Sequence, residues 1–402
     1  MKTKRKVVLH VGFAKTASTS IQDTLDHNRK LLQPFGVEFA RFEFRGKNLN
    51  NHSLHINNVF SDCPEQHHII VKNQLDAAAL KKSAEVELKQ QLDSHDNLII
   101  SGEEVPFMSV GELSKVKDYF DQKSIDLRVI AFVRRPLSFL ESLAQQRVKS
   151  GYPIQIAYNN SPAKMVRKIQ AVFSNAEFYS FEEACEHTYG PTGFFLDLCG
   201  IGNIEKFKII KNNESIANGA TRLIGHMNFV QPVIKIHRLN SPRQEGDTVI
   251  FQSIPGDRFE LVSHEVRQDV LKEENRWLSA NLGSEFTDRK PAAQVAKSNW
   301  NEASFRMLRD ALTRCNSYLI PLAYSFFYNN PQMDAKTRAL ASNTFAGLKV
   351  DEHFQQHAVA FKEAAIKLEK SNTRDALRLM EMAWLGNKTD PQTSIKLRDY
   401  RK

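Results

Sequence analysis

Short apolar runs alternate with longer amphipathic segments along the first third of the chain. The short runs are rich in β-branched residues and span residues 7–11, 37–39, 98–100 and 127–133. Apolar residues recur at helical spacing over residues 18–32, 75–92 and 109–120. Strands that alternate with helices in this way predict an α/β fold, with a mainly parallel sheet covered by helices on both faces.

The rest of the chain is mostly helical in pattern. A helix is expected to begin at Pro136, directly after the strand 127–133, because proline is favoured at the first helical position. Residues 151–340 are irregular and predict no topology. Residues 351–398 carry two apolar stripes that resemble one tetratricopeptide-like hairpin, although a helical cap or an oligomer contact is the plainer interpretation of a single copy. We therefore expect an α/β domain over 1–340 and a helical extension over 341–402.

Composition and charge narrow the class of ligand. The chain has 402 residues, of which 17 are Gly and 14 are Pro, so collagen-like and low-complexity classes are excluded. With 55 Lys and Arg against 46 Asp and Glu, the formal net charge is +9. This excess favours a polyanionic ligand such as a nucleotide, a nucleic acid or an acidic sugar, without choosing among them.

The cysteines and the apolar runs indicate the compartment. The four cysteines are far apart and form no CxxC pair: Cys63, Cys185, Cys199 and Cys315. Neither a disulfide framework nor a zinc cassette is expected from this spacing. The basic residues 1–6 resemble the start of a signal peptide, but the apolar run 7–14 contains His10 and stops at Lys15. With no run long enough for a membrane span, we expect a cytoplasmic protein.

The segment between the first strand and the first helix has the composition of an anion site. Residues 12–20 read GFAKTASTS. Small residues let backbone N–H groups approach an anion, the helix N-terminus adds positive potential, and hydroxyls with Lys15 complete a phosphate cradle. It is not a Walker A loop, because that motif has a glycine directly before the lysine, whereas Ala14 precedes Lys15 and Gly12 is three residues away. A Ser/Thr-capped helix with a surface lysine is the structural alternative.

A second anion site is expected after the strand 127–133. That strand ends at Arg134, and Ser142 lies eight residues farther along, on the helix that Pro136 opens. Eight residues is about two helical turns, which returns the serine hydroxyl to the side of Arg134. Two separated anion sites on one sheet imply a nucleotide that is phosphorylated at both ends.

These residues resemble the sulfotransferases that use 3′-phosphoadenosine 5′-phosphosulfate (PAPS). The segment that looks like their 5′-phosphosulfate loop, often written KTGTTS, is Lys15, Thr16, Ala17, Ser18, Thr19 and Ser20. Ala17 and Ser18 depart from the commoner Gly and Thr, but KTASTS also occurs among sulfotransferases of acidic polysaccharides. Arg134 and Pro136, followed by Ser142, look like the family's 3′-phosphate motif.

The resemblance covers roughly residues 1–320, with specific motifs only in 1–150. It implies a P-loop-like sheet, PAPS-binding motifs in 1–150 and an acceptor-side region over 151–340. The donor would be PAPS and the product adenosine 3′,5′-bisphosphate (PAP), with no metal. The implied acceptor is a carbohydrate or polysaccharide hydroxyl, less readily an amine, and no nucleic acid is expected. The C-terminal helices would serve a protein partner or self-association.

Two carboxylates follow the buried strand at 98–100. Glu103 and Glu104 would lie where reacting groups gather in an open α/β sheet, near Lys15 and Arg134. Glu103 is the expected catalytic base for an acceptor hydroxyl, and the strand-end S-x-E of related bacterial enzymes maps onto it. Glu104 is the reserve, with pairing to a basic neighbour as its structural alternative. Lys15 would be catalytic as well, by stabilising charge on the leaving oxygen.

Other polar residues are weaker candidates for the acceptor side. An Asn-His pair near this position in similar sequences singles out His52, since histidine is the base in some sulfotransferases. Arg147 and Lys149 extend the basic face beyond Ser142 and would meet an anionic sugar or the nucleotide, unless they are merely solvated. No zinc site is expected from the sequence cluster His52, His55, His67 and His68, because it lacks a nearby cysteine pair or an HExxH helix.

The sequence leaves two other functions open. A P-loop nucleotide kinase would require Mg²⁺ and ATP, and the missing Walker A pair weighs against it. A non-catalytic basic module would bind acidic polysaccharide or nucleic acid with steep salt dependence and no preference for a 3′-phosphate.

Overall fold

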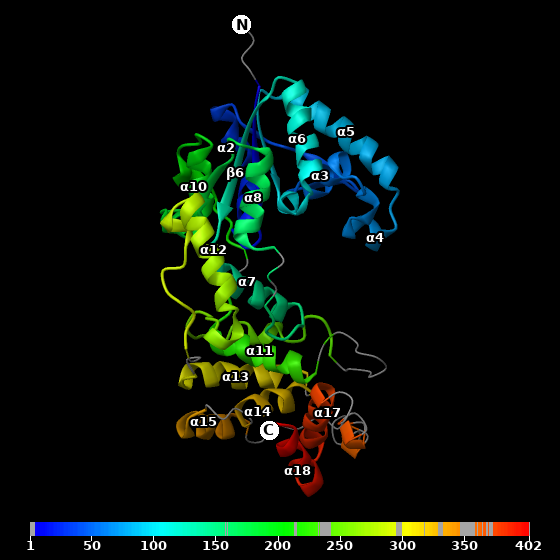
Figure 1. Ribbon diagram of the computed structural model, residues 1–402, viewed down its shortest axis with the longest axis vertical. Helices are drawn as coiled ribbons and strands as arrows, with labels where there is room; N and C mark the ends of the chain where they lie inside the picture. The colour runs from blue at the N-terminus through cyan, green and yellow to red at the C-terminus, as the bar shows by residue number, and fades with distance from the viewer. Residues whose placement is uncertain are drawn as a thin grey trace. The chain divides into compact units, whose positions relative to one another are not determined.

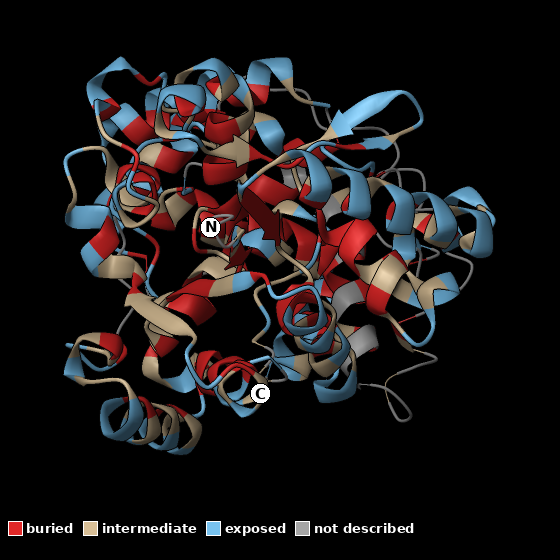
Figure 2. Ribbon diagram, turned by 90° about the horizontal axis from the view of Figure 1, so that it is seen from above, coloured by how far each residue is buried: buried red, intermediate tan, exposed pale blue. Residues whose placement is uncertain are grey.

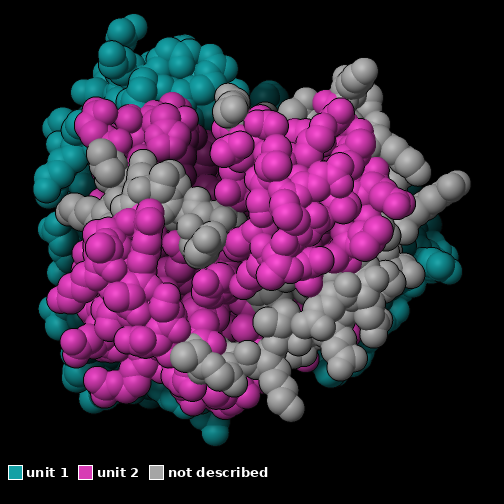
Figure 3. Space-filling view, turned by 90° about the horizontal axis from the view of Figure 1, so that it is seen from below, with its two compact units in different colours: residues 1–139, 157–214, 267–291 teal, residues 140–156, 215–266, 292–402 magenta. Residues whose placement is uncertain are grey.

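The chain divides into two compact units. The structure, a computed structural model (Figure 1), describes residues 5–156, 158, 160–212, 215–231, 233, 243–294, 300–316, 318–328, 333–345, 358–359, 361–363, 365–366, 369 and 373–401. The units, coloured in Figure 3, comprise residues 1–139, 157–214 and 267–291, and residues 140–156, 215–266 and 292–402. The units are interleaved along the chain, whereas the sequence predicted one linear boundary. The division into 1–340 and 341–402 stays a prediction.

The first unit is built on a five-stranded sheet. Its strands, in spatial order, are β2 (Glu38–Phe39), β5 (Asn97–Gly102), β1 (Lys6–Val11), β6 (Asp126–Val133) and β7 (Glu177–Ser180). Every neighbouring pair in this sheet is parallel. The predicted α/β class and the four predicted strands are therefore confirmed. The fifth strand, β7, lies in a region for which the sequence predicted no topology.

The central strands are buried on both faces, which explains their nearly continuous apolar sequences. The strands of the sheet are largely drawn as buried in Figure 2. On one face, Ile99 of β5 and Phe132 of β6 belong to a core cluster that also contains Ile21, Leu25 and Phe195 from helices. This burial holds the ends of the strands in place, and the residues of the candidate site follow directly after these ends.

Helices and a small hairpin surround this sheet. The helices are α1 (Ser18–His27), α2 (Arg29–Leu32), α3 (Ser53–Phe60), α4 (His68–Asn73), α5 (Ala77–Ser94), α6 (Val110–Gln122), α8 (Pro162–Val172), α9 (Phe181–Glu186), α10 (Gly190–Leu198) and α12 (Gln268–Asn281). The hairpin pairs β3 (Phe42–Phe44) with β4 (Lys47–Leu49). The three predicted helical segments are confirmed, but the first is broken at Asn28. The Asn28 amide donates to the carbonyl oxygens of Thr24 and Lys208, at 2.7 and 3.0 Å, and so competes with a continuous helix.

The second unit is helical. It contains α11 (Asn218–Val230), α13 (Glu302–Arg314), α14 (Leu319–Tyr328), α15 (Ala335–Phe345), α17 (Thr373–Gly386) and α18 (Pro391–Tyr400), and it takes up most of α7 (Pro136–Lys149). The helix predicted from Pro136 and the helical C-terminal region are thus confirmed. In the described ranges, no helix combines the length and the apolar character that a membrane span requires.

Part of the predicted C-terminal hairpin is described. One of the two apolar stripes predicted within residues 351–398 comprises Ala376, Leu379, Met380 and Ala383, and it is buried on α17. In the other predicted stripe Ala358, Phe361 and Ala365 are buried, while Phe354 and Leu368 lie outside the described residues. The tetratricopeptide-like character of this region stays a prediction.

Candidate functional site

The carboxyl ends of four parallel strands meet at one edge of the sheet. Val11 of β1 pairs with Gly102 of β5, and Val133 of β6 pairs with Ser180 of β7. The residues that follow these ends include the loop 12–17, Glu103 and Arg134. Ligands of open α/β sheets bind at this edge. The structure therefore gathers the main sequence candidates of the first unit in one place.

The loop between β1 and α1 has an unusual backbone. Lys15 and Ala17 both have left-handed conformations, with φ of 67° and 61°. This conformation is unfavourable for residues with a Cβ, and such strain clusters at ligand sites. Ala17 is also the N-cap of α1 and makes no side-chain cap hydrogen bond. The loop therefore presents a strained turn and a helix N-terminus without a cap from that residue, which together favour an anion.

One buried hydroxyl points into this loop. Ser18 is 4% exposed, and its Oγ has no hydrogen-bond partner among the residues that the structure describes. A Cβ placed on Gly12 would lie 2.7 Å from Ser18 Oγ and 3.2 Å from Glu103 Cα, so a larger residue there would displace the Ser18 side chain and crowd the Glu103 backbone. Leaving a buried hydroxyl unpaired costs about 1–3 kcal/mol. An arrangement that tolerates this cost is expected where a ligand supplies the missing partner.

The other loop hydroxyls are already engaged. Thr16 Oγ1 donates to the carbonyl of Phe13 at 2.7 Å and so fixes the turn. Ser20 Oγ accepts from the backbone N–H of Asn212 at 3.0 Å. Thr19 Oγ1 donates to Glu103 Oε1 at 2.9 Å. Within the predicted loop, Ser18 is thus the residue whose buried hydroxyl has no hydrogen-bond partner among the described residues.

Arg134 joins the two predicted anion motifs. Its Nη1 donates to the carbonyl of Lys15 at 2.9 Å, and its Nε donates to Ser138 Oγ at 2.8 Å. The guanidinium also lies over the Phe181 ring, 5.2 Å from the centroid. These contacts fix the charge beside the loop before any ligand binds. Ser138 was not predicted, although a serine four residues after Arg134, one helical turn on, was a signal that could have been used.

Three predicted residues lie farther along α7. Ser142, Arg147 and Lys149 belong to the second unit, and their roles toward the nucleotide or acceptor stay predictions. The Arg147 guanidinium lies 5.0 Å from the centroid of the Tyr152 ring. Burial lowers the pKa of Lys149.

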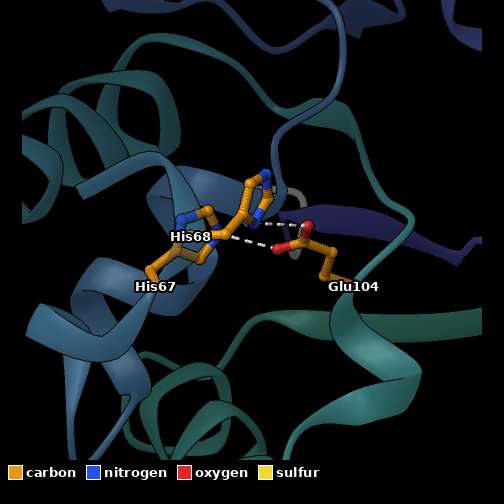
Figure 4. Close-up of side chains that lie close together, drawn as sticks. All are labelled: His67, His68 and Glu104. Atoms are coloured by element: carbon orange, nitrogen blue, oxygen red, sulfur yellow. Dashed lines mark hydrogen bonds and ion pairs between the residues drawn. The ribbon is translucent and has the colours of Figure 1, made fainter. Parts of the chain in front are cut away.

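The two carboxylates after β5 have different partners. Glu103 is half-buried and accepts the hydrogen bond from Thr19, so it lies beside the first turn of α1. Glu104 accepts from His67 Nε2 at 2.7 Å and lies 3.5 Å from His68 Nδ1 (Figure 4). The hydrogen bond from His67 holds the pKa of Glu104 below its usual value. Pairing with a basic neighbour was the structural alternative for Glu104, and the role of Glu103 as the base stays a prediction.

His52 lies in the interior. It is 0% exposed, and its Nδ1 accepts from the backbone N–H of Ser101 at 3.1 Å. Its ring lies between Phe39 and Phe42, with centroids 4.7 and 5.0 Å away. Burial lowers the pKa of His52 to about 3. In this conformation His52 braces the end of β5 and does not reach an acceptor, so its predicted role on the substrate side lacks support from this geometry.

A second buried histidine lies under the same edge. His10 Nδ1 is 2.8 Å from Ser101 Oγ, which also accepts from Gln22 Nε2 at 3.0 Å. Burial lowers the pKa of His10 to about 3, so the ring is neutral at pH 7. His10, Ser101 and Gln22 form a polar network that joins β1, β5 and α1 beneath the loop.

Comparisons with known proteins give the fold distant parallels. No family model matches the chain, and no curated protein matches it. One solved chain that matches is a sulfotransferase from Alicyclobacillus acidocaldarius, with 15% identity, a TM-score of 0.31, and coverage of 52% of this chain and 87% of that chain. Another comes from the PezAT chromosomal toxin–antitoxin system of Streptococcus pneumoniae, with 15% identity, a TM-score of 0.24, and coverage of 48% and 78%. Likeness this distant assigns no family, and the function has to be argued from the site.

Proposed function

We propose that the protein is a PAPS-dependent sulfotransferase that acts on a hydroxyl, less readily an amine, of a carbohydrate acceptor. The observation that carries the proposal is the buried, unpartnered Ser18 hydroxyl in a left-handed loop at the N-terminus of α1. Lys15 in that loop and Arg134 beside it supply two positive charges at the same edge. A nucleotide with phosphate groups at both ends would use both.

The residues present fit such a nucleotide. Lys15, the Ser18 hydroxyl and the first-turn N–H groups of α1 would bind the 5′-phosphosulfate. Arg134, with a serine of α7, would bind the 3′-phosphate, the serine being Ser142 by resemblance to the family motif or Ser138 by its observed contact. PAPS would supply a sulfuryl group that is already activated by its bond to phosphate.

The carboxylate of Glu103 would act as the base. It would accept the proton of the acceptor hydroxyl while the acceptor oxygen forms a bond to sulfur. The bond between sulfur and the bridging oxygen breaks, and its electron pair leaves with the phosphate of PAP. Lys15 would stabilise the charge that develops there, and loss of such a group typically lowers the rate about 10²- to 10³-fold. Thr19 would orient Glu103 through the hydrogen bond already present.

The proposed acceptor follows from the family resemblance and from the charge of the chain. The family resemblance supports a carbohydrate or polysaccharide, and the net charge of +9 suits an anionic one. Residues of the second unit, including Arg147 and Lys149, remain candidates for contacting it. The C-terminal helices remain candidates for a protein partner or self-association.

Calorimetric titration tests the donor assignment. PAP should bind the wild-type protein more tightly than AMP or ATP, and Lys15→Ala and Arg134→Ala should each weaken PAP binding. Lys30→Ala is the matched control, because Lys30 is an exposed lysine on α2 away from the loop. If PAP binds no better than AMP, or if both site variants bind it normally, the proposal fails. Uniform binding of polyanions with steep salt dependence would then favour a basic binding module.

One contact favours a second candidate, phosphoryl transfer from ATP. In P-loop enzymes a hydroxyl and a carboxylate hold Mg²⁺, and the Thr19 hydroxyl in the first turn of α1 lies 2.9 Å from the Glu103 carboxylate after β5. This candidate predicts that ATP binding requires Mg²⁺ and is lost in Glu103→Gln. The sulfotransferase proposal predicts instead that Glu103→Gln binds PAP normally and that EDTA has no effect on the binding.

A further inference from the structure

A group of two imidazoles and one carboxylate lies next to the proposed site, outside the residues assigned to the nucleotide. In the described part of the chain, His67, His68 and Glu104 are the one group of three or more metal-binding side chains in close proximity, with ligand atoms all within 4.8 Å of one another. The sequence predicted no metal because these histidines lacked suitable neighbours. The fold brings in Glu104, which is 37 residues from His67. The tertiary structure therefore assembles a group of metal-binding side chains that the sequence did not predict.

Two of the three side chains are fixed in place. Glu104 follows β5, and its backbone N–H donates to Ser53 Oγ at 2.9 Å. The His67 side chain is 7% exposed, and its Nδ1 accepts from the backbone N–H of Ile69 at 3.3 Å. His68 is 67% exposed and stacks on His67 with ring centroids 4.6 Å apart. Figure 4 shows both rings converging on the carboxylate.

An ordinary histidine–carboxylate pair needs only one imidazole, whereas two imidazoles approach the Glu104 carboxylate. His187 and Asp197 form such a pair at 3.0 Å with two residues. Near Glu104, His67 already occupies one carboxylate oxygen at 2.7 Å, yet His68 Nδ1 lies 3.5 Å from the other. Ligands at about 2.0–2.2 Å from a tetrahedral ion are separated by about 3.3–3.5 Å. To share one ion, the 2.7 Å contact would lengthen to this spacing, and the most widely separated pair of ligand atoms, which lie within 4.8 Å, would shorten by at most about 1.5 Å.

We propose that His67 Nε2, His68 Nδ1 and a carboxylate oxygen of Glu104 bind a borderline dication of the Zn²⁺ class. Imidazole nitrogens favour zinc and related transition metals over Mg²⁺ or Ca²⁺, which prefer oxygen ligands. Three protein ligands leave at least one coordination position for water, and the exposure of His68 leaves this side open to solvent. The ion would cross-link the start of α4 to the end of β5. The inference does not rest on the proposed function.

Binding would require one rearrangement of a proton. In the free protein, the contacts of His67 are those of the Nε2–H tautomer, in which Nε2 donates to the carboxylate and Nδ1 accepts from the Ile69 N–H. Coordination through Nε2 moves the ring proton to Nδ1 and ends the hydrogen bond from Ile69. That bond is long, at 3.3 Å, so its loss is a small cost against three metal–ligand bonds.

Zinc titration of the chelator-treated, full-length protein tests the site. We expect one saturable equivalent of Zn²⁺ in the wild type and an affinity at least about tenfold weaker in Glu104→Gln and in His68→Ala. Cobalt(II) should give visible absorption bands in the wild type that both variants lose. His187→Ala is the matched control, because it removes a histidine–carboxylate pair without a third ligand. Cys63→Ser controls for the exposed thiol four residues before His67.

Two results would overturn the site. One is the absence of saturable zinc binding in the wild type, and the other is an affinity unchanged in both ligand variants. His68 is exposed, so His68→Ala should fold normally and keep the test interpretable. Titration of His68→Ala with PAP measures nucleotide binding, and so tests the proposed function separately from the zinc site. Loss of zinc binding with PAP binding retained is the expected outcome, whereas failure of PAP binding in the wild type would leave the zinc result standing.

Discussion

Two buried polar sites, one in each unit, are built in opposite ways. In the second unit the Arg243 and Asp247 side chains are 0% and 1% exposed and join at 2.7 Å. Arg243 also donates to the Gln231 carbonyl and to Asn228 Oδ1, each at 2.9 Å. In the first unit the buried Ser18 hydroxyl has no such partner in the described ranges.

The difference separates a structural polar group from a binding group. The charges of Arg243 and Asp247 pair with each other, so this pair contributes to the fold and gives no sign of a missing ligand. The loop around Ser18 combines an unsatisfied hydroxyl with strained backbone at Lys15 and Ala17. Such costs persist where function requires them. We infer that the unpartnered Ser18 hydroxyl, combined with the strained backbone at Lys15 and Ala17, marks the binding edge of this molecule more than charge alone does.

The largest effect on stability is expected from breaking the complete cluster. Arg243→Ala leaves the Asp247 carboxylate buried without its main partner, which should lower the free energy of unfolding by about 3–5 kcal/mol. Denaturant unfolding measures this change. Arg314→Ala is the control, because its pair with Asp310 is 60% exposed on both sides and should contribute less than about 1 kcal/mol. Equal losses in the two variants would contradict the comparison.

The pH dependence of stability should report the buried histidines of the first unit. Burial depresses the pKa of His52 to about 3, so the unfolded chain binds a proton at a higher pH than the folded chain. Stability should be fully present above about pH 6.5 and decline as the pH falls toward 3, by up to about 1.4 kcal/mol per pH unit for this group. His52→Asn keeps an acceptor for the Ser101 N–H and should reduce the slope. An unchanged slope would show that His52 is protonated in the folded state.

A smaller effect is expected from relieving the loop strain. Ala17 has φ of 61° and ψ of 20°, a conformation that glycine adopts without a Cβ clash. Ala17→Gly should raise the free energy of unfolding by about 0.5–1 kcal/mol, the relief outweighing the added freedom of the unfolded chain. Thermal unfolding measures the shift, with Ala78→Gly in the first turn of α5 as a control that should destabilise. A loss in both variants would show that the Ala17 conformation is not strained.

The fold was predictable where short stretches of the sequence have a clear pattern of apolar and polar residues. The strands β1, β5 and β6 each contain a short, mainly apolar run that predicted them, and the structure confirms them. The break at Asn28 depends on a contact with the Lys208 carbonyl, and no local pattern reveals it. The strand β7 reads EFYS and lacks the short apolar run from which the other strands were predicted.

The sequence predicted which residues lie at the edge of the sheet, but not which of them form hydrogen bonds with one another. Parallel strands place Lys15 and Arg134 at one edge, and their contact agrees with that expectation. The bond from Thr19 to Glu103 joins residues 84 apart, which one sequence cannot pair. The burial of His52 also escaped prediction, because Phe39 and Phe42 enclose it only in the folded chain.

Paired measurements on Ser18→Ala test the central claim most directly. The unpartnered hydroxyl contributes nothing to the free protein, so the free energy of unfolding should stay within about 0.5 kcal/mol of the wild type or rise. The affinity for PAP should fall about 10- to 100-fold, because a hydrogen bond to a charged group contributes about 1.5–3 kcal/mol. A variant that binds PAP as the wild type does would contradict the claim that this hydroxyl waits for a ligand.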